Sequence, residues 1–199
     1  TQLRELAPKM LDEARLEHGE IKVYGTPRRL AVLVQELAPR QKSVERQVKG
    51  PPAKAAFDSL GAPTKAAEGF ARGQGVAVGD LQVQDLEGGK YVVAIRREEG
   101  QPAAQVLAER LPNLIAALKF DKTMRWNHTN VAFSRPIRWL IALLGDVAIP
   151  FEYAGVSSGR TTIGARSNGS SEIALQGATD YMDALRDQRI IADVDERRA

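Results

Sequence analysis

Two tryptophans and five cationic side chains are concentrated in residues 119–145, a combination that can bind nucleic acid. Each tryptophan directly follows an arginine, and the stretch holds a single acid, Asp121. Arginine and lysine contact phosphates, while aromatic rings stack on bases or on guanidinium groups. The alternative is that both tryptophans are core residues and the arginines a solvated rim. The stretch contributes five candidate binding residues: Lys122, Arg125, Trp126, Arg135 and Arg138.

Three further arginines are candidates for the same basic surface. Arg28 and Arg29 follow the turn at 25–27 between two alternating runs, so a β-hairpin is predicted with one arginine on each face of its second strand. At least one of them then faces water or a partner; the alternative is a plain basic strand end. Arg160 precedes two threonines and could hold a phosphate or polarise a carbonyl, or it could be structural.

The sequence contains no convincing catalytic pattern. There is no cysteine, so a thiolate nucleophile and a thiolate zinc site are excluded, and two histidines leave little room for a metal centre. No phosphate-binding loop with the G-x-x-x-x-G-K-[ST] spacing is present. A serine–histidine–aspartate arrangement around His128 has no evident partner. Binding is therefore the chemistry that the residues favour, with no catalytic residue, metal or cofactor predicted in this chain.

Composition is that of a folded protein with a basic face. The chain has 199 residues, is 43% hydrophobic and carries a net charge of +3. Residues 22–72 hold ten Lys or Arg against four acids, which is typical of a surface that meets a phosphate backbone. No run of 18 apolar residues and no apolar leader in residues 1–20 is present, so neither a membrane span nor a signal peptide is expected.

The hydrophobic patterns predict one compact mixed α/β (α+β) domain over residues 1–199. Its central sheet, mostly antiparallel or mixed, is expected to include the three most strand-like apolar runs, near 29–35, 90–96 and 139–144. Amphipathic patterns predict covering helices in 3–17, 53–60, from 64 onward, 103–118 and 178–186.

Several short sequence motifs occur together in one known family. They are Gly25-Thr-Pro-Arg-Arg-Leu30, Lys49-Gly-Pro-Pro, Thr64-Lys-Ala-Ala-Glu-Gly-Phe-Ala71, Lys122-Thr-Met-Arg-Trp126, Phe133-Ser-Arg-Pro-Ile-Arg-Trp139, Leu143-Leu-Gly-Asp146 and Gly159-Arg-Thr-Thr. In this order and spacing they resemble the β subunit of the bacterial two-subunit (α2β2) glycyl-tRNA synthetase. The resemblance covers almost the whole chain.

The resemblance implies a part of a cytoplasmic, heterotetrameric ligase that makes glycyl-tRNA from ATP, glycine and tRNA(Gly). It implies glycine activation, with ATP and Mg²⁺, in the α subunit, and tRNA binding and subunit assembly in the β subunit. The chain would be an N-terminal, B3/B4-like fragment without catalytic activity of its own. The sequence departs from the family pattern in two places. It starts after the family's Gly-Thr-Glu-Glu-Leu-Pro motif, and it has Gly164-Ala-Arg-Ser167 where the family has Gly-His-Arg-Phe. No role of that histidine is therefore carried over.

Two other classes of function compete with this expectation. In one, the tryptophans and basic loops bind a protein partner, because aromatic residues and arginine are also enriched at protein interfaces. In the other, the module is an editing hydrolase for mischarged tRNA, a reading that depends on analogy of fold alone. Salt dependence of binding separates phosphate recognition from an apolar interface.

Overall fold

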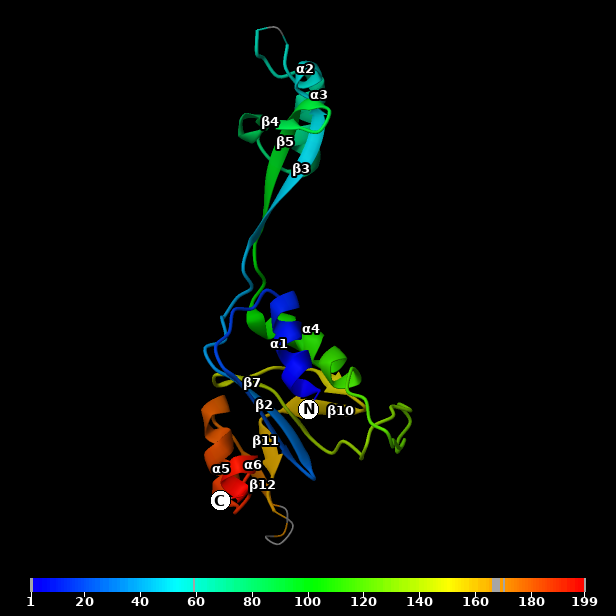
Figure 1. Ribbon diagram of the computed structural model, residues 1–199, viewed down its shortest axis with the longest axis vertical. Coiled ribbons are helices and arrows are strands. Elements are labelled where there is room, and N and C mark those ends of the chain that lie inside the picture. The colour runs from blue at the N-terminus through cyan, green and yellow to red at the C-terminus, as the bar shows by residue number, and fades with distance from the viewer. Residues whose placement is uncertain (1, 59, 166–168, 170, 199) are drawn as a thin grey trace. The chain divides into compact units, whose positions relative to one another are not determined.

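The computed structural model describes residues 2–58, 60–165, 169 and 171–198, and its contacts divide the chain into two compact units. Unit 1 is formed by residues 1–41 and 101–199, and unit 2 by residues 42–100 (Figure 1). Unit 2 is thus an insertion whose two ends leave neighbouring positions of unit 1. There the Gln41 N–H donates to the Gln101 carbonyl at 2.9 Å, and the Gln101 N–H to Gln41 Oε1 at 3.2 Å. That residues 1–199 behave as a single domain stays a prediction.

Unit 2 is a three-stranded antiparallel sheet with helices packed against it. The strand order is β3-β5-β4, with β3 Val44–Pro52, β4 Gln82–Leu86 and β5 Gly89–Glu98. The helices are α2 Ala53–Ala56, α3 Lys65–Gln74 and the 3-10 turn η1 Val78–Asp80. Ala56, Ala67 and Val92 form the buried centre. Small side chains on the helices allow this close approach to the sheet.

Two of the sequence motifs, 49–52 and 64–71, come into contact in unit 2, where Gly50 of β3 lies directly under the ring of Phe70 of α3. A Cβ on residue 50 would come within 2.5 Å of Phe70 Cε1 and 2.7 Å of Cζ. Gly50 is therefore required by packing. Its backbone conformation does not demand glycine, because its φ is not positive.

We expect Gly50→Ala to lower the free energy of unfolding of unit 2 by about 1–3 kcal/mol, the usual cost of overpacking. Gly69→Ala in α3 is the matched control, because a Cβ there meets nothing within 4 Å and alanine favours helix. Hydrogen exchange of the β5 amides, recorded over a urea titration, measures the free energy of unfolding of both variants. Equal stability of the Gly50→Ala and Gly69→Ala proteins would show that Phe70 moves aside at no cost.

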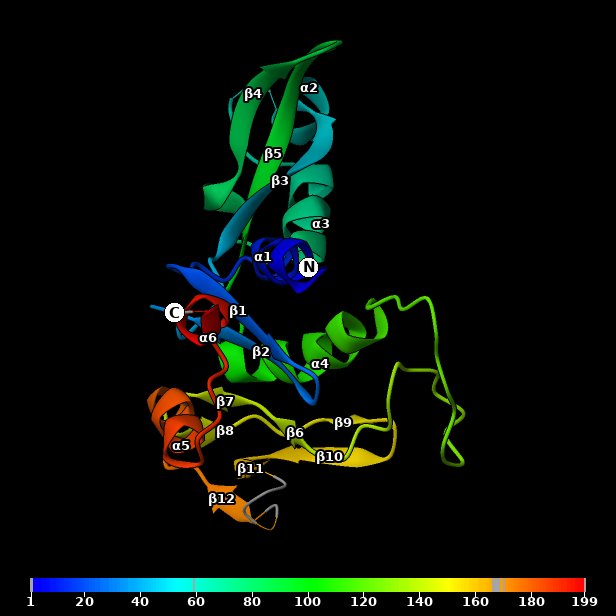
Figure 2. The same ribbon diagram turned by 60° about the horizontal axis from the view of Figure 1, so that its bottom comes forward.

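Unit 1 combines helices with four small sheets. Its helices are α1 Leu3–Glu13, α4 Ala103–Ala116, the 3-10 turn η3 Ala178–Asp180, α5 Tyr181–Asp187 and α6 Val194–Arg198. Its strands are β1 Ile21–Thr26, β2 Arg29–Val34, β6 Leu140–Ile141, β7 Leu143–Leu144, β8 Val147–Ala148, β9 Glu152–Tyr153, β10 Val156–Gly159, β11 Thr161–Ile163 and β12 Glu172–Ala174. They pair as β1-β2, β6-β10-β9, β7-β8 and β11-β12. Figure 2 shows β6 to β12 and α5 below α1 and α4.

The core of unit 1 lies where α1 and α4 meet the strands that follow. Leu11, Leu16, Val106 and Ile149 are nearly inaccessible to solvent and belong to one cluster. Leu11 comes from α1 and Val106 from α4, so the two helices are joined through apolar contacts that span about a hundred residues of sequence. No helix of the described residues is long and apolar enough to cross a membrane.

The predicted mixed α+β class, with antiparallel and mixed sheets, is confirmed, and so is the 21–34 hairpin. The prediction that the three apolar runs share one sheet is wrong, because β2 and β5 lie in different sheets and the third run is divided between two others, through β6 and β7. The 139–144 run is interrupted at Ala142, whose N–H donates to Gly159 while its carbonyl accepts from Ile149. The B3/B4 likeness stays a prediction. The word at 164–167 lies partly outside the described residues.

Candidate functional site

A loop of 23 residues connects α4 to β6 and carries most of the candidate binding residues. Residues 117–139, called the basic loop below, contain no helix or strand apart from a single bridge between Met124 and Phe133. Figure 2 shows it running out from the end of α4 and returning to β6. Connections longer than about 12–15 residues without secondary structure are uncommon in compact domains and are often functional.

Specific contacts hold the basic loop in one conformation. The Met124 and Phe133 backbones exchange two hydrogen bonds, of 2.8 and 3.2 Å. The rings of Phe120 and Phe133 meet edge to face, with centroids 4.7 Å apart. These contacts bring the two arms of the loop together around Phe133.

Asn127 anchors the tip of the basic loop to the β9–β10 turn. Its Nδ2 donates to the Ala154 carbonyl at 2.6 Å, and its Oδ1 accepts from the Thr129 N–H at 3.2 Å and hydroxyl at 2.6 Å. Ala154 and Gly155 both have positive φ, at 55° and 75°, and the tight turn they form faces Asn127. The side chain therefore makes a local turn and a distant contact at once. Sequence reasoning missed it, although an Asn two residues before a Thr is a signal for such a turn.

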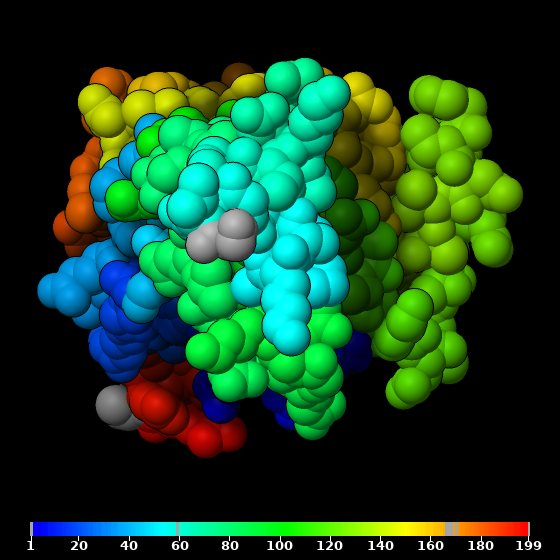
Figure 3. Space-filling model, turned by 90° about the horizontal axis from the view of Figure 1, so that it is seen from above, coloured from blue at the N-terminus to red at the C-terminus, as the bar shows by residue number. Residues whose placement is uncertain are grey.

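Five cations of the basic loop are exposed, and four of them are the candidate residues Lys122, Arg125, Arg135 and Arg138. Arg125 donates from Nε to the Asn130 carbonyl at 3.1 Å, which orients its guanidinium and leaves its terminal nitrogens outward. Among the ion pairs between described residues, none involves any of these four side chains. The loop, yellow-green in Figure 3, is open to solvent in that view. Trp126 is half-buried beside Arg125.

Arg29 occupies a different environment from these cations. It is 9% exposed, and its Nη2 donates to the carbonyl of Ile163 and, at 3.5 Å, to that of Gly164. Its guanidinium carbon lies 5.5 Å from the centre of the Trp139 ring, a cation–π contact. Burial lowers the pKa of Arg29. This geometry favours a structural role, in which Arg29 connects β2 to β11 and supports Trp139.

Arg28 and Arg160 complete the predicted set. Arg28 is half-buried in the hairpin turn, and its backbone N–H donates to Thr26 Oγ1 at 3.3 Å. Arg160 donates to three backbone carbonyls, those of Asp146 at 2.9 Å, Gln176 at 3.3 Å and Leu175 at 3.4 Å. Arg160 thus ties two turns together, whereas the Arg28 side chain has no such partner among the described residues.

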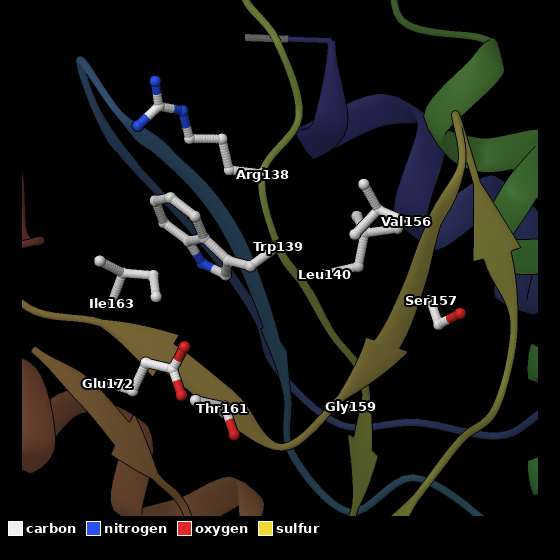
Figure 4. A pocket seen from close by; sticks show the side chains of 9 residues that line it. All are labelled: Arg138, Trp139, Leu140, Val156, Ser157, Gly159, Thr161, Ile163 and Glu172. Carbon is white, nitrogen blue, oxygen red and sulfur yellow. The ribbon is translucent and has the colours of Figure 1, made fainter. Parts of the chain in front are cut away.

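A pocket of about 210 Å³ lies beside the end of the basic loop, and sequence reasoning did not predict it. It is open on one side and joins strands β6, β10, β11 and β12 (Figure 4). Its walls are formed by Arg138, Trp139, Leu140, Val156, Ser157, Gly159, Thr161, Ile163 and Glu172. Of the predicted residues only Arg138 contributes. The pocket depends on strand pairings, such as Ile163 with Glu172, that no local sequence pattern reveals.

The chain is similar to known proteins of one class. The similar proteins are glycine–tRNA ligases, which are aminoacyl-tRNA synthetases. The β subunit of Desulforamulus reducens is 46% identical over 198 residues, which cover 100% of this chain and 28% of that protein. That of Desulfitobacterium hafniense strain DCB-2 is 47% identical over 197 residues, 99% of this chain and 28% of that protein. The glycine–tRNA ligase, chloroplastic/mitochondrial 2, of Arabidopsis thaliana is 45% identical over 197 residues, 99% of this chain and 18% of that protein.

A sequence model of the family described as glycyl-tRNA synthetase beta subunit matches residues 1–199. The chain therefore belongs to the glycyl-tRNA synthetase β subunit family. It spans 28% of the length of the bacterial relatives named above.

Proposed function

We propose that this chain is the part of a glycine–tRNA ligase β subunit that presents a basic surface to tRNA(Gly). In the whole enzyme, ATP, glycine and tRNA(Gly) are converted to glycyl-tRNA, and glycine activation with ATP and Mg²⁺ takes place in the α subunit. The observation that carries the proposal is the set of four exposed cations on the ordered basic loop, none in an ion pair with a described carboxylate.

The state of these four side chains suits phosphate binding. A cation already paired with a carboxylate must break that pair before it meets a phosphate, and these four avoid that cost. The contacts of Asn127 and Phe133 order the loop in advance, which reduces the entropy lost on binding. Phosphate contacts position RNA without reading its sequence, so selection of tRNA(Gly) would come from other parts of the enzyme.

The remaining predicted residues take two roles in this proposal. Trp126 and Arg28 border the basic surface, where a ring can stack and a partly exposed guanidinium can reach a phosphate. Arg29 and Arg160 support it from inside, because their donors already bind backbone carbonyls. Met124 is an apolar residue, 48% exposed on the same loop, and we assign it to the proposed contribution to subunit assembly.

The test is tRNA(Gly) binding by the assembled enzyme over a salt series. Replacing Arg125 and Arg138 together with Ala is expected to flatten the slope of log affinity against log salt by roughly one unit for each lost phosphate contact. Lys9→Ala is the matched control, because Lys9 is an exposed cation on α1 that pairs with Glu13. An unchanged slope and affinity in a folded double variant would overturn the proposal, and weaker association with the α subunit would instead favour assembly.

The assignment of chemistry to the α subunit has its own check. The chain alone is expected to show no glycine-dependent exchange of pyrophosphate into ATP. Exchange by the purified chain would place glycine activation in this part of the β subunit.

A further inference from the structure

The pocket beside Trp139, called the Trp139 pocket below, has the parts of a site for one flat, polar ring. Trp139 provides an aromatic surface, and the apolar side chains of Leu140, Val156 and Ile163 form walls around it. In Figure 4 the carboxylate of Glu172 points toward the indole, and Arg138 extends on the other side of the ring. Its volume of about 210 Å³ is below the roughly 300–1,000 Å³ of sites for drug-sized ligands. It therefore fits one planar group better than a whole nucleotide.

Trp139 is held rigidly, as a stacking surface must be. Arg29 lies over its ring at 5.5 Å, and Arg29 is itself fixed by the carbonyls of Ile163 and Gly164. Trp139 lines the pocket, whereas Arg29 does not. The ring is thus supported from the interior and available to the pocket.

The polar groups around the opening differ in the bonds they can form. Glu172 supplies carboxylate acceptors and Arg138 supplies cationic donors, and both side chains are exposed. No ion pair joins Glu172 to another described residue. A carboxylate accepts hydrogen bonds from the amino groups of bases, and an arginine at the edge meets phosphate.

We propose that the Trp139 pocket binds a single unpaired base of the RNA, stacked on Trp139, with Glu172 accepting from the amino group of the base and Arg138 contacting the adjacent phosphate. The inference depends on the proposed function, because it assumes that RNA lies along the basic loop. RNA is read mainly at unpaired bases that stack on aromatic side chains, and Arg138 belongs to both the loop and the pocket. The basic loop then positions the RNA backbone, while the pocket reads one base.

The test uses the assembled enzyme and three fluorescein-labelled tetranucleotides, oligo(A), oligo(C) and oligo(U), each measured over a salt series. Trp139→Ala is expected to weaken binding of every tetranucleotide roughly 5- to 150-fold, the effect of one lost stacking contact, with the salt slope unchanged. Trp139→Phe keeps an aromatic ring and should retain most of the affinity.

Glu172→Lys tests the pocket without touching the packing of Trp139, because Glu172 is exposed. Replacing an acceptor with a donor should shift the preference from oligo(A) and oligo(C), which carry amino groups, toward oligo(U), whose base has a carbonyl acceptor in place of the amino group. Glu109→Lys on α4 makes the same charge change at an exposed site outside the pocket, and should leave the preference unaltered.

The outcomes separate this inference from the proposed function. An unchanged preference in Glu172→Lys, or full affinity in Trp139→Ala, overturns the base pocket even if the Arg125 and Arg138 variant shows the expected loss of slope. No measurable binding of any tetranucleotide to the parent at low salt also overturns it. Displacement of the tetranucleotide by free amino acids would identify the pocket as an amino-acid site and overturn it too. If the preference shifts in Glu172→Lys while the Arg125 and Arg138 variant keeps the salt slope of the parent, only the proposed phosphate surface is refuted.

Discussion

Arg29→Ala is expected to lower the free energy of unfolding of unit 1 by about 3 kcal/mol. The substitution leaves the carbonyls of Ile163 and Gly164 without a donor, and each buried unsatisfied group costs about 1–3 kcal/mol. It also removes the cation from the face of Trp139, worth about 0.5–2 kcal/mol. Urea denaturation of the chain, followed by Trp139 fluorescence in a Trp126→Phe background, measures this loss.

Two variants test the cause of that loss. Arg28→Ala changes the neighbouring, half-buried arginine and should alter stability by no more than about 0.5 kcal/mol. Arg29→Met keeps most of the apolar volume and avoids burial of a charge, the same burial that lowers the pKa of Arg29. It should therefore lose less than Arg29→Ala. If Arg28→Ala and Arg29→Ala were equally stable, the contacts of Arg29 would not stabilise the fold.

Asn127→Ala is expected to release the basic loop from the β9–β10 turn. The variant loses the bond to the Ala154 carbonyl and two bonds from Thr129, so the local opening free energy should fall by about 1–3 kcal/mol. Cleavage by trypsin at the exposed Lys122, Arg125 and Arg138 should then accelerate roughly 5- to 150-fold, since one tenfold change corresponds to about 1.4 kcal/mol. Global stability should change much less than the cleavage rate.

Asn113→Ala is the control for the loss of an asparagine. The Asn113 side chain is exposed on α4 and donates only to the Glu109 carbonyl of its own helix. It should leave cleavage in the basic loop at the parent rate. Equal cleavage of the Asn127→Ala and parent proteins would mean that the Met124–Phe133 bridge alone orders the loop.

Local sequence patterns were sufficient for elements whose partners are close in the chain. The hairpin was predictable because alternating residues and a Pro-containing turn specify β1 and β2. The predicted position of the turn, 25–27, was wrong: Thr26 pairs with Arg29, so the turn is formed by Pro27 and Arg28, and Arg28 does not start the second strand. The run at 139–144 was harder, because its two halves pair with different strands and Ala142 bonds on both sides. The insertion of unit 2 was not predicted, since no change in composition marks its ends at 42 and 100.

In the candidate site, too, features that depend on neighbouring residues could be predicted and features that depend on distant residues could not. The exposed state of Lys122, Arg125, Arg135 and Arg138 could be anticipated from a polar, Pro-containing stretch without periodicity. The burial of Arg29 could not, because it depends on carbonyls at Ile163 and Gly164, more than 130 positions away. The Trp139 pocket was likewise invisible, because strands far apart in the chain form its walls.

The basic loop is tested most directly by tRNA(Gly) binding to the assembled enzyme after its four candidate cations, Lys122, Arg125, Arg135 and Arg138, are changed to Ala. We expect the salt slope to become less steep by about 3–4 units, at roughly 0.7–0.9 per phosphate contact, and affinity at low salt to fall. Changing four exposed cations outside the loop, Arg4, Lys9, Lys54 and Arg110, to Ala provides the charge-matched control. If the loop variant keeps the slope and affinity of the parent while remaining folded and assembled, the basic loop does not bind tRNA.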